Sequence, residues 1–314
     1  MNTKDINVMV ISALPPVMLA ELEQLFTIHN YWLADDKADL LRKTASSIQG
    51  VVTRSHLGID AHLINALPSL EIISIFGVGL DAVDLNAAKQ RGIIVTHTPR
   101  VLSECVADTA LALMLNVSRR YCEADRFSRS NTWVKGPFPA SSRMNGKICG
   151  IAGLGHVGHA VAKRAQAFNM PIHYFDPYLQ DEQFKRFDSV TALAESCDFL
   201  VLTLPGGADT FHLVGSEVLA ALGNEGILVN VARGSIVDTP ALIDALKHNV
   251  ISGAGLDVFE DEPNIPNELY QFNNVVLFPH LASNTHETRT DMANLALNNI
   301  KGYFENGQVL TPVK

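Results

Sequence analysis

One stretch near the middle of the chain decides the fold: Lys147-Ile148-Cys149-Gly150-Ile151-Ala152-Gly153-Leu154-Gly155-His156-Val157-Gly158-His159-Ala160-Val161-Ala162-Lys163-Arg164. Its first six residues are largely apolar and predict a buried strand, and the last six have the spacing of a helix. Residues 153–158 between them match the pattern GxGxxG. In dinucleotide-binding folds the first glycine permits a tight turn, the second lets a pyrophosphate approach the backbone, and the third lets helix and strand pack closely. The phosphates then bind free N–H groups at the positive end of the helix.

A second strand and an acidic residue follow at the spacing typical of this pattern. Residues 172–175 are Ile-His-Tyr-Phe, and Asp176 comes directly after them. A carboxylate about 20 residues beyond the glycine loop binds the ribose hydroxyls of adenosine in such folds. GxGxxG alone also occurs in ordinary turns, but here strand, loop, helix, strand and acid occur in order. We therefore predict a dinucleotide site formed by Gly153, Leu154, Gly155, His156, Val157, Gly158 and Asp176.

Short β-branched runs alternate with helically spaced segments along the whole chain. The expected strands are residues 7–11, 50–53, 72–75, 93–96, 147–152, 172–175, 199–204, 227–231, 253–258 and 275–278. The expected helices are residues 16–25, 61–67, 85–91, 157–167, 216–222 and 240–247. This alternation predicts an α/β protein with parallel sheets that helices cover on both faces.

One segment interrupts the alternation and suggests how the domains are arranged. Residues 103–129 have the pattern of a single long helix, apolar in its first half and charged in its second. We predict two Rossmann-like, doubly wound parallel-sheet domains, with the second inserted into the first. The first domain is discontinuous and comprises residues 1–98 and 285–314, whereas residues 99–284 form the second.

Composition excludes several classes of partner. The chain has 314 residues, of which 47% are hydrophobic and 18% charged, and its net charge of −9 argues against nucleic acid as a partner. The four cysteines form neither a CxxC pair nor a Cys/His metal spacing, so we expect reduced, mostly buried thiols and no metal site. No apolar run is long enough for a signal peptide or a membrane span. We therefore expect a cytoplasmic protein that does not bind membranes.

Polar residues follow three of the later strands, where ligands of open α/β sheets bind. They are Arg233, the acidic residues Glu260 and Glu262, and His280. An arginine can hold a carboxylate by two bonds, and a histidine can transfer a proton near neutral pH. A glutamate behind that histidine would orient the ring and favour its protonated form. Each residue also has a plainer interpretation. Arg233 could cap a turn, and the acidic residues could form a solvated loop. His280 is one of 11 histidines and could be an ordinary surface or hydrogen-bonded residue.

These residues belong to a longer series of motifs that resembles the D-isomer-specific 2-hydroxyacid dehydrogenase family, in its branch of hydroxyphenylpyruvate and glyoxylate/hydroxypyruvate reductases. The resemblance covers nearly the whole chain from about residue 45. Its landmarks are residues 76–81 with Val83-Asp84, Val95-Thr96, Thr98-Pro99, residues 106–108, 153–158, 231–234 and 256–260, Glu262-Pro263, Pro279-His280 and Thr288-Arg289. The family's acid directly precedes proline, so the resemblance selects Glu262 over Glu260.

The resemblance implies an NAD-dependent enzyme that reduces a small 2-oxo acid to the D-2-hydroxy acid and catalyses the reverse oxidation. His280 would protonate the developing alkoxide, with Glu262 bonded to its other ring nitrogen. Arg233 would bind the carboxylate and polarise the ketone oxygen. The backbone N–H groups of Val78 and Gly79 would complete the carboxylate site, so the discontinuous domain would bind substrate and the inserted domain NAD.

The resemblance also implies cofactor contacts and a dimer. The residues placed along the cofactor are Val231, Ala232, Arg233 and Asp257, the last near the nicotinamide amide. We interpret Asp81 and Asp84 as turn and helix caps. In this family the long helix and the loop after it form a homodimer interface that includes Trp133, although Trp133 could equally be a core anchor.

Two departures from the family pattern affect specificity. Gly77 stands where relatives often carry serine, so the contacts that this loop makes with substrate are not defined by the resemblance. Phe175-Asp176-Pro177 stands where the NADP-using reductases of this branch carry serine and arginine. We therefore expect NAD (NADH) to be preferred over NADP. The sequence leaves open glyoxylate, hydroxypyruvate and aryl pyruvates as substrates, and an NAD(H)-sensing, corepressor-like protein as the alternative function.

Overall fold

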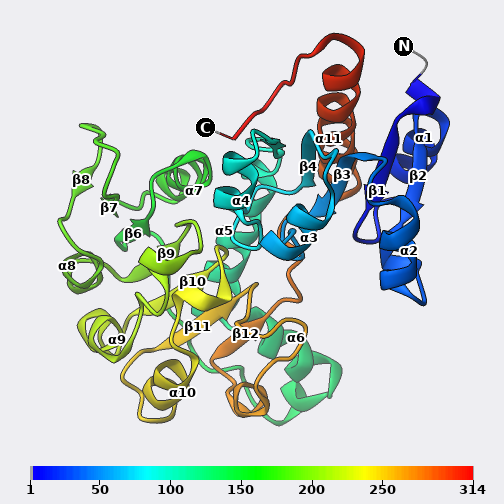
Figure 1. Ribbon diagram of the computed structural model, residues 1–314. Coiled ribbons are helices and arrows are strands. Elements are labelled where there is room, and N and C mark those ends of the chain that lie inside the picture. The colour runs from blue at the N-terminus through cyan, green and yellow to red at the C-terminus, as the bar shows by residue number, and fades with distance from the viewer. Residues whose placement is uncertain (1–2, 314) are drawn as a thin grey trace. The chain divides into compact units, whose positions relative to one another are not determined.

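The computed structural model describes residues 3–313, which form two compact units (Figure 1). Unit 1 comprises Met1–Leu102 and His286–Lys314, and unit 2 comprises Ser103–Thr285. The boundaries predicted after residues 98 and 284 lie close to these. Unit 1 is therefore assembled from the two ends of the sequence, with unit 2 between them.

Unit 1 contains a five-stranded parallel sheet in the order β2-β1-β3-β4-β5. Its strands are β1 (Asn7–Val10), β2 (Thr27–Asn30), β3 (Ile48–Arg54), β4 (Ile72–Phe76) and β5 (Ile94–Thr96). Its helices are α1 (Pro16–Leu25), α2 (Lys37–Thr44), α3 (Ala61–Ala66), α4 (Leu85–Gln90) and α11 (His286–Asn306), with short 3-10 helices η1 (Thr3–Asp5) and η2 (Tyr31–Leu33). One apolar cluster packs α3 and α4 on one face, and a second packs α1 and α11 on the other.

Unit 2 contains a seven-stranded parallel sheet in the order β12-β11-β10-β9-β6-β7-β8. Its strands are β6 (Cys149–Ala152), β7 (Ile172–Phe175), β8 (Lys185–Arg186), β9 (Phe199–Leu202), β10 (Ile227–Asn230), β11 (Gly253–Leu256) and β12 (Val275–Leu277). Its helices are α5 (Ser103–Arg119), α6 (Tyr121–Arg129), α7 (His156–Ala167), α8 (Val190–Glu195), α9 (Ser216–Leu222) and α10 (Thr239–Lys247). Four 3-10 helices complete it: η3 (Thr132–Lys135), η4 (Ala208–Thr210), η5 (Gly234–Ile236) and η6 (Asn267–Gln271).

Both strand orders are those of doubly wound folds. Unit 1 has the order 2-1-3-4-5, and unit 2 follows the dinucleotide-binding order 3-2-1-4-5-6 with one strand added. In unit 2 the order reverses between β6 and β9, and ligands bind such sheets at the carboxyl ends of the strands beside the reversal. The predicted α/β class, with two doubly wound parallel sheets, is confirmed.

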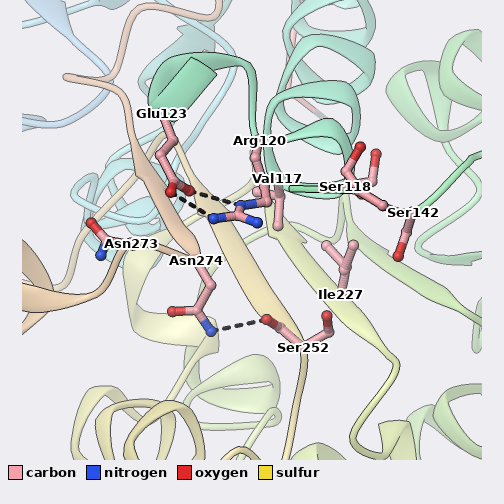
Figure 2. A pocket seen from close by; sticks show the side chains of 11 residues that line it. Val117, Ser118, Arg120, Glu123, Ser142, Ile227, Ser252, Asn273 and Asn274 are labelled. Atoms are coloured by element: carbon pink, nitrogen blue, oxygen red, sulfur yellow. Dashed lines mark hydrogen bonds and ion pairs between the residues drawn. The ribbon is translucent and has the colours of Figure 1, made fainter. Parts of the chain in front are cut away.

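The prediction of one long helix over residues 103–129 is wrong. The helix breaks at Arg120, which has a left-handed φ of 56°, and the chain continues as α6. The guanidinium of Arg120 forms two bonds with the carboxylate of Glu123, at 2.8 and 2.6 Å (Figure 2). It also lies 5.0 Å from the centroid of the Phe138 ring. A left-handed residue costs about 1–2 kcal/mol, and these contacts offset that cost.

The cysteines are free, as expected, but they are not mostly buried. Only Cys149 is buried, and the other three are partly exposed. Within residues 3–313, no helix is both long and apolar enough to cross a membrane. The same residues contain no group of three or more histidine, cysteine or acidic side chains that could hold a metal ion.

Candidate functional site

The glycine loop connects β6 to α7, and each of its three positions requires glycine for a different structural reason. Gly153 has a left-handed φ of 96°. A Cβ on Gly158 would lie 2.2 Å from the carbonyl oxygen of Gly153, so helix and loop can approach only without a side chain there. A Cβ on Gly155 would meet no protein atom within 4 Å. The second glycine therefore leaves open space at the start of α7, which fits a dinucleotide pyrophosphate.

Asp176 connects the glycine loop to the loop after β7. Its carboxylate accepts N–H bonds from Leu154 at 2.8 Å and from Tyr178 and Leu179 at 2.9 Å each. Three of its roughly four acceptor positions are thus filled within the protein, and the residue is only 9% exposed. The sequence did not reveal this bracing role, nor the contact between the Arg186 guanidinium and the Asp176 carbonyl oxygen at 3.1 Å.

The structure brings Glu262 and His280 together. They follow the neighbouring strands β11 and β12, whose carboxyl ends lie at the same edge of the sheet. Nδ1 of His280 lies 2.6 Å from Oε2 of Glu262, while Oε1 of Glu262 accepts the N–H of Phe259 at 3.0 Å. The imidazole is thereby oriented through one nitrogen. This is the arrangement of a histidine that transfers protons at its other nitrogen.

Charge and hydrogen bonding favour the ionised form of Glu262. Burial alone would raise the pKa of this carboxyl group, but the hydrogen bonds from His280 and Phe259 and the charges of His280 and Arg233 outweigh it. The pKa of Glu262 is therefore lower than its ordinary value. An ionised glutamate accepts the N–H of Nδ1 and so leaves the other ring nitrogen of His280 to face the substrate.

The second acid of the loop has a different partner. Oε1 of Glu260 lies 2.5 Å from Nε2 of His212, whose ring stacks on Phe211 with centroids 3.9 Å apart. Glu260 thus pairs with a histidine of the loop after β9, and Glu262 pairs with His280. The geometry agrees with the choice of Glu262 as the acid behind the histidine.

Arg233 follows β10, and a buried asparagine fixes its turn. The side chain of Asn230 accepts the N–H of Ala232 at 3.0 Å and donates to the carbonyl oxygen of Arg233 at 2.8 Å. A Cβ on Gly234 would lie 1.9 Å from the carbonyl carbon of Phe259, so the turn packs directly on the loop after β11. Val231 and Ala232 are buried in the same turn. Sequence reasoning missed Asn230, whose position as the last residue of a buried strand was the available signal.

Asp257 acts on the site through the loop that carries His280. Its carboxylate is fully buried and accepts the N–H groups of Leu281 at 2.8 Å and Ala282 at 3.0 Å. Burial raises the pKa of Asp257 in spite of these two bonds. The N–H of His280 also donates to the Asp257 carbonyl oxygen at 2.8 Å, and His280 has a left-handed φ of 49°. Asp257 therefore fixes the backbone on both sides of the histidine side chain.

Val78 and Gly79 lie in unit 1, in the loop after β4. Gly77 before them has a φ of 146°, and a Cβ there would lie 2.4 Å from the hydroxyl oxygen of Ser55. Ser55 therefore occupies the space that a serine at position 77 would need. The Asp84 carboxylate caps α4 by accepting a backbone N–H at 2.8 Å, which confirms its interpretation as a cap.

A cavity of about 250 Å³ lies at the amino ends of strands in the unit 2 sheet (Figure 2). The glycine loop, in contrast, follows the carboxyl end of β6. The cavity is lined by Val117, Ser118, Arg120, Glu123, Ala140, Ser141, Ser142, Ile227, Ser252, Asn273 and Asn274. Ile227 begins β10, and Ser252 and Asn274 directly precede β11 and β12. The cavity is therefore at the amino ends of these strands and does not belong to the site built by the polar residues described above.

Comparison with known proteins identifies the family. Residues 111–282 match the model of the D-isomer specific 2-hydroxyacid dehydrogenase NAD binding domain. The chain is 44% identical to a glyoxylate/hydroxypyruvate reductase A of Arabidopsis thaliana, over 99% of both chains. The chain belongs to the D-isomer specific 2-hydroxyacid dehydrogenase family. It is an oxidoreductase, and the resemblance seen in its motifs is confirmed.

Two further family members resemble the chain over its length. A hydroxyphenylpyruvate reductase of Plectranthus scutellarioides is 44% identical, over 98% of this chain and 99% of the relative. A solved structure of an NADPH-dependent glyoxylate/hydroxypyruvate reductase from Sinorhizobium meliloti, in complex with NADP and malonate, is 40% identical. The TM-score between the two structures is 0.91, and the match covers 98% of this chain and 97% of the chain in the solved structure. Members of this family at similar identity thus include an enzyme described as NADPH-dependent.

Proposed function

We propose that the chain catalyses the reduction of a small 2-oxo acid to the D-2-hydroxy acid with NADH, and the reverse oxidation. The observation that carries the proposal is the His280–Glu262 pair at the sheet edge that also carries Arg233. In this proposal unit 2 binds the cofactor, and the Val78–Gly79 loop of unit 1 contributes N–H groups to the substrate carboxylate.

Each side chain has a separate task in this reaction. The cofactor, held by the glycine loop of unit 2, would supply the hydride that the carbonyl carbon of the substrate accepts. Arg233 holds the carboxylate and polarises the ketone oxygen, since its planar guanidinium matches a carboxylate by two bonds. His280 holds the proton that the ketone oxygen takes up as it becomes a hydroxyl group. Glu262 keeps the ring oriented and its charge stabilised until that transfer.

We further propose that NADH is preferred over NADPH. Asp176 presents a carboxylate at the end of β7. The phosphate on the ribose 2′ position of NADP would place its negative charge beside this carboxylate. Two unit charges 4 Å apart repel by about 4 kcal/mol at an effective dielectric of about 20. We expect a preference of roughly 100-fold in kcat/KM, which corresponds to about 2.7 kcal/mol. Arg186, whose guanidinium donates to the Asp176 carbonyl oxygen, is a cation close to this site and would reduce the preference.

The test is a matrix of kcat/KM values for glyoxylate, hydroxypyruvate and hydroxyphenylpyruvate with NADH and with NADPH. Oxidation of NADH by at least one of these acids is the expected result, with glycolate as the product from glyoxylate and the D-hydroxy acid as the product from the other two. Equal use of both cofactors would refute the cofactor preference but not the reaction. Tight NADH binding without turnover of any 2-oxo acid would refute the reaction and favour an NAD(H)-sensing protein.

We also propose a homodimer formed through α5, α6 and the loop after them. Trp133 is 69% exposed and Val134 is 75% exposed, both in the 3-10 helix after α6. Trp133 is therefore not a core anchor, and two adjacent exposed apolar side chains are typical of an interface. We expect a particle of twice 34.2 kDa by light scattering, and a monomer for Trp133→Asp. Tyr270→Asp, at a side chain 60% exposed elsewhere in unit 2, is the matched control.

A further inference from the structure

A histidine at the start of α7 connects this helix to the loop between β7 and β8. His159 directly follows the last glycine of the glycine loop. Nδ1 of its ring lies 3.0 Å from the carbonyl oxygen of Gly155, and Nε2 lies 3.0 Å from Oδ2 of Asp181. Asp181 belongs to residues 176–184, which join β7 to β8 and begin with Asp176. The ring therefore links the helix that follows the glycine loop to the loop that carries the proposed ribose acid.

Both partners of the ring are hydrogen-bond acceptors. A carbonyl oxygen and an ionised carboxylate have no proton to donate, so each nitrogen of the ring must supply one. A neutral imidazole has a single N–H, whereas an imidazolium has two. The two contacts of His159 are therefore both hydrogen bonds only when the ring is protonated, and deprotonation removes one of them.

The electrostatics of the contact favour the same state. Burial lowers the pKa of His159, but the bonds to Asp181 and to the backbone outweigh it, and the pKa is higher than the ordinary value of 6.5. His159 in turn lowers the pKa of Asp181, so the acid stays ionised. The acids of α5, which packs on α7, have another partner, since Glu104 and Asp108 pair with Arg164. Asp181 thus supplies the charge that holds the proton on His159.

The other contacts of the loop do not involve a proton that titrates near neutral pH. The Asp181 backbone bonds with the Tyr174 hydroxyl of β7 at 2.7 and 3.2 Å, and Oδ1 of Asp181 accepts the N–H of Gln183 at 2.9 Å. Asp176 ties the start of the loop to the glycine loop through a backbone N–H. His159 adds the bond to α7, and because its side chain is 43% exposed, its proton exchanges with solvent. The strength with which α7 holds the loop therefore depends on pH.

We propose that His159 is a positioning residue for the cofactor, which in its protonated form holds the loop between β7 and β8 in place to bind the adenosine half of NAD. Deprotonation releases the loop from α7 and weakens that binding. The proposal rests on the cofactor site proposed for unit 2 and adds a regulation of that site by pH. The sign follows from the raised pKa of His159: the contact is complete below the ordinary value of 6.5 and is lost as the pH rises through the raised value.

Binding of ADP-ribose at different pH values tests this role without catalysis. The ligand contains the adenosine half and the pyrophosphate of NAD, and its charge is constant over the range in which a histidine titrates. We expect its affinity, measured by calorimetry, to be about fivefold lower on the alkaline side of the His159 titration than on the acidic side, a factor typical of coupled sites. His159→Gln keeps a hydrogen-bond donor but does not titrate, so its affinity should not change across this range. His248→Gln removes another histidine of unit 2, whose Nδ1 lies 3.1 Å from Asp244, and should keep the change.

Asp181→Asn separates the fastening of the loop from a direct effect of charge. Loss of a negative charge near the site would strengthen the binding of anionic ADP-ribose if charge alone were responsible. If His159 acts by holding the loop, the variant should instead bind ADP-ribose more weakly at acidic pH. The change in affinity should also move to lower pH, because Asp181 raises the pKa of His159. Since binding and protonation are reciprocal, ADP-ribose should raise the pKa of His159 in an NMR titration of the natural protein.

Several results would overturn this role of His159. They are an equal change of affinity with pH in His159→Gln, tighter binding of ADP-ribose by Asp181→Asn, and a His159 pKa that ADP-ribose leaves unchanged. Reduction of a 2-oxo acid with NADH, by a protein whose affinity for ADP-ribose does not change with pH, would overturn the role and leave the reaction standing. Absence of ADP-ribose binding at every pH would refute the cofactor site and the role of His159 together.

Discussion

Replacing Asp176 by alanine should destabilise unit 2 rather than simply change the cofactor. The substitution removes the acceptor of three backbone N–H groups, from Leu154, Tyr178 and Leu179. Leu154 is fully buried, so water cannot replace the carboxylate there, and the loss costs about 1.5–3 kcal/mol. Tyr178 is 90% exposed, and its N–H can bond to water at a smaller cost.

We therefore expect a total loss of about 3 kcal/mol in the free energy of unfolding. For a unit of this size that corresponds to a decrease of roughly 6–12 °C in unfolding temperature. Since the Leu154 N–H belongs to the glycine loop, affinity for NADH and for NADPH should both fall. Exchange of Asp176 for serine together with Pro177 for arginine should then narrow the cofactor ratio only at a cost in stability.

Thermal unfolding followed by circular dichroism and cofactor titration followed by fluorescence measure these effects. Asp188→Ala is the control, because Asp188 is an exposed acid of the same unit. An unfolding temperature for Asp176→Ala within about 1 °C of that of the natural protein would refute the bracing role. A gain in NADPH affinity without loss of stability would show that the carboxylate acts on the cofactor alone.

Three further substitutions test the site. His280→Gln should lower kcat at least about 100-fold and leave NADH affinity unchanged, as single-turnover and binding measurements would show; near-normal turnover would exclude His280 as the proton donor. Arg233→Lys should raise KM and lower kcat together, because lysine keeps the charge but loses the planar fork, so unchanged steady-state values would place Arg233 outside the substrate site. For Glu262→Gln, denaturant unfolding against pH is decisive. Because the pKa of Glu262 is lowered in the folded protein, its carboxylate stabilises the fold at pH values above its ordinary pKa of 4.5. The natural protein should lose this advantage over the glutamine variant as the pH falls through the lowered pKa. A difference in unfolding free energy between the two proteins that does not depend on pH would contradict this prediction.

The sequence was sufficient for features whose cause is local. The glycine loop was recognisable because the turn, the close approach and the helix start each require a residue type at a fixed position. The helix of residues 16–25 was predicted with its bounds as observed in α1. Most of the other expected strands and helices differ from the observed ones by a few residues at their ends.

Features with a distant cause were missed. β2 and β8 carry little buried apolar surface, so neither shows the hydrophobic pattern of a strand. The contacts that offset the break at Arg120 include one with Phe138, which is remote in sequence and could not be identified as a partner of Arg120. Glu260 and Glu262 were separated only by resemblance to a family, because the histidines they contact lie on different loops.

The divided chain of unit 1 has a consequence for synthesis on the ribosome. Helix α11 covers one face of its sheet, and the Ser74 hydroxyl donates to the Ala296 carbonyl oxygen at 2.9 Å across 222 residues of sequence (Figure 1). This helix is synthesised only after the whole of unit 2. Unit 2 can therefore fold while one apolar face of the amino-terminal strands is still uncovered. Domains that are synthesised first usually fold first, but unit 1 can be completed only after unit 2. Chaperones that bind nascent chains should therefore stay on the first hundred residues until translation is nearly complete.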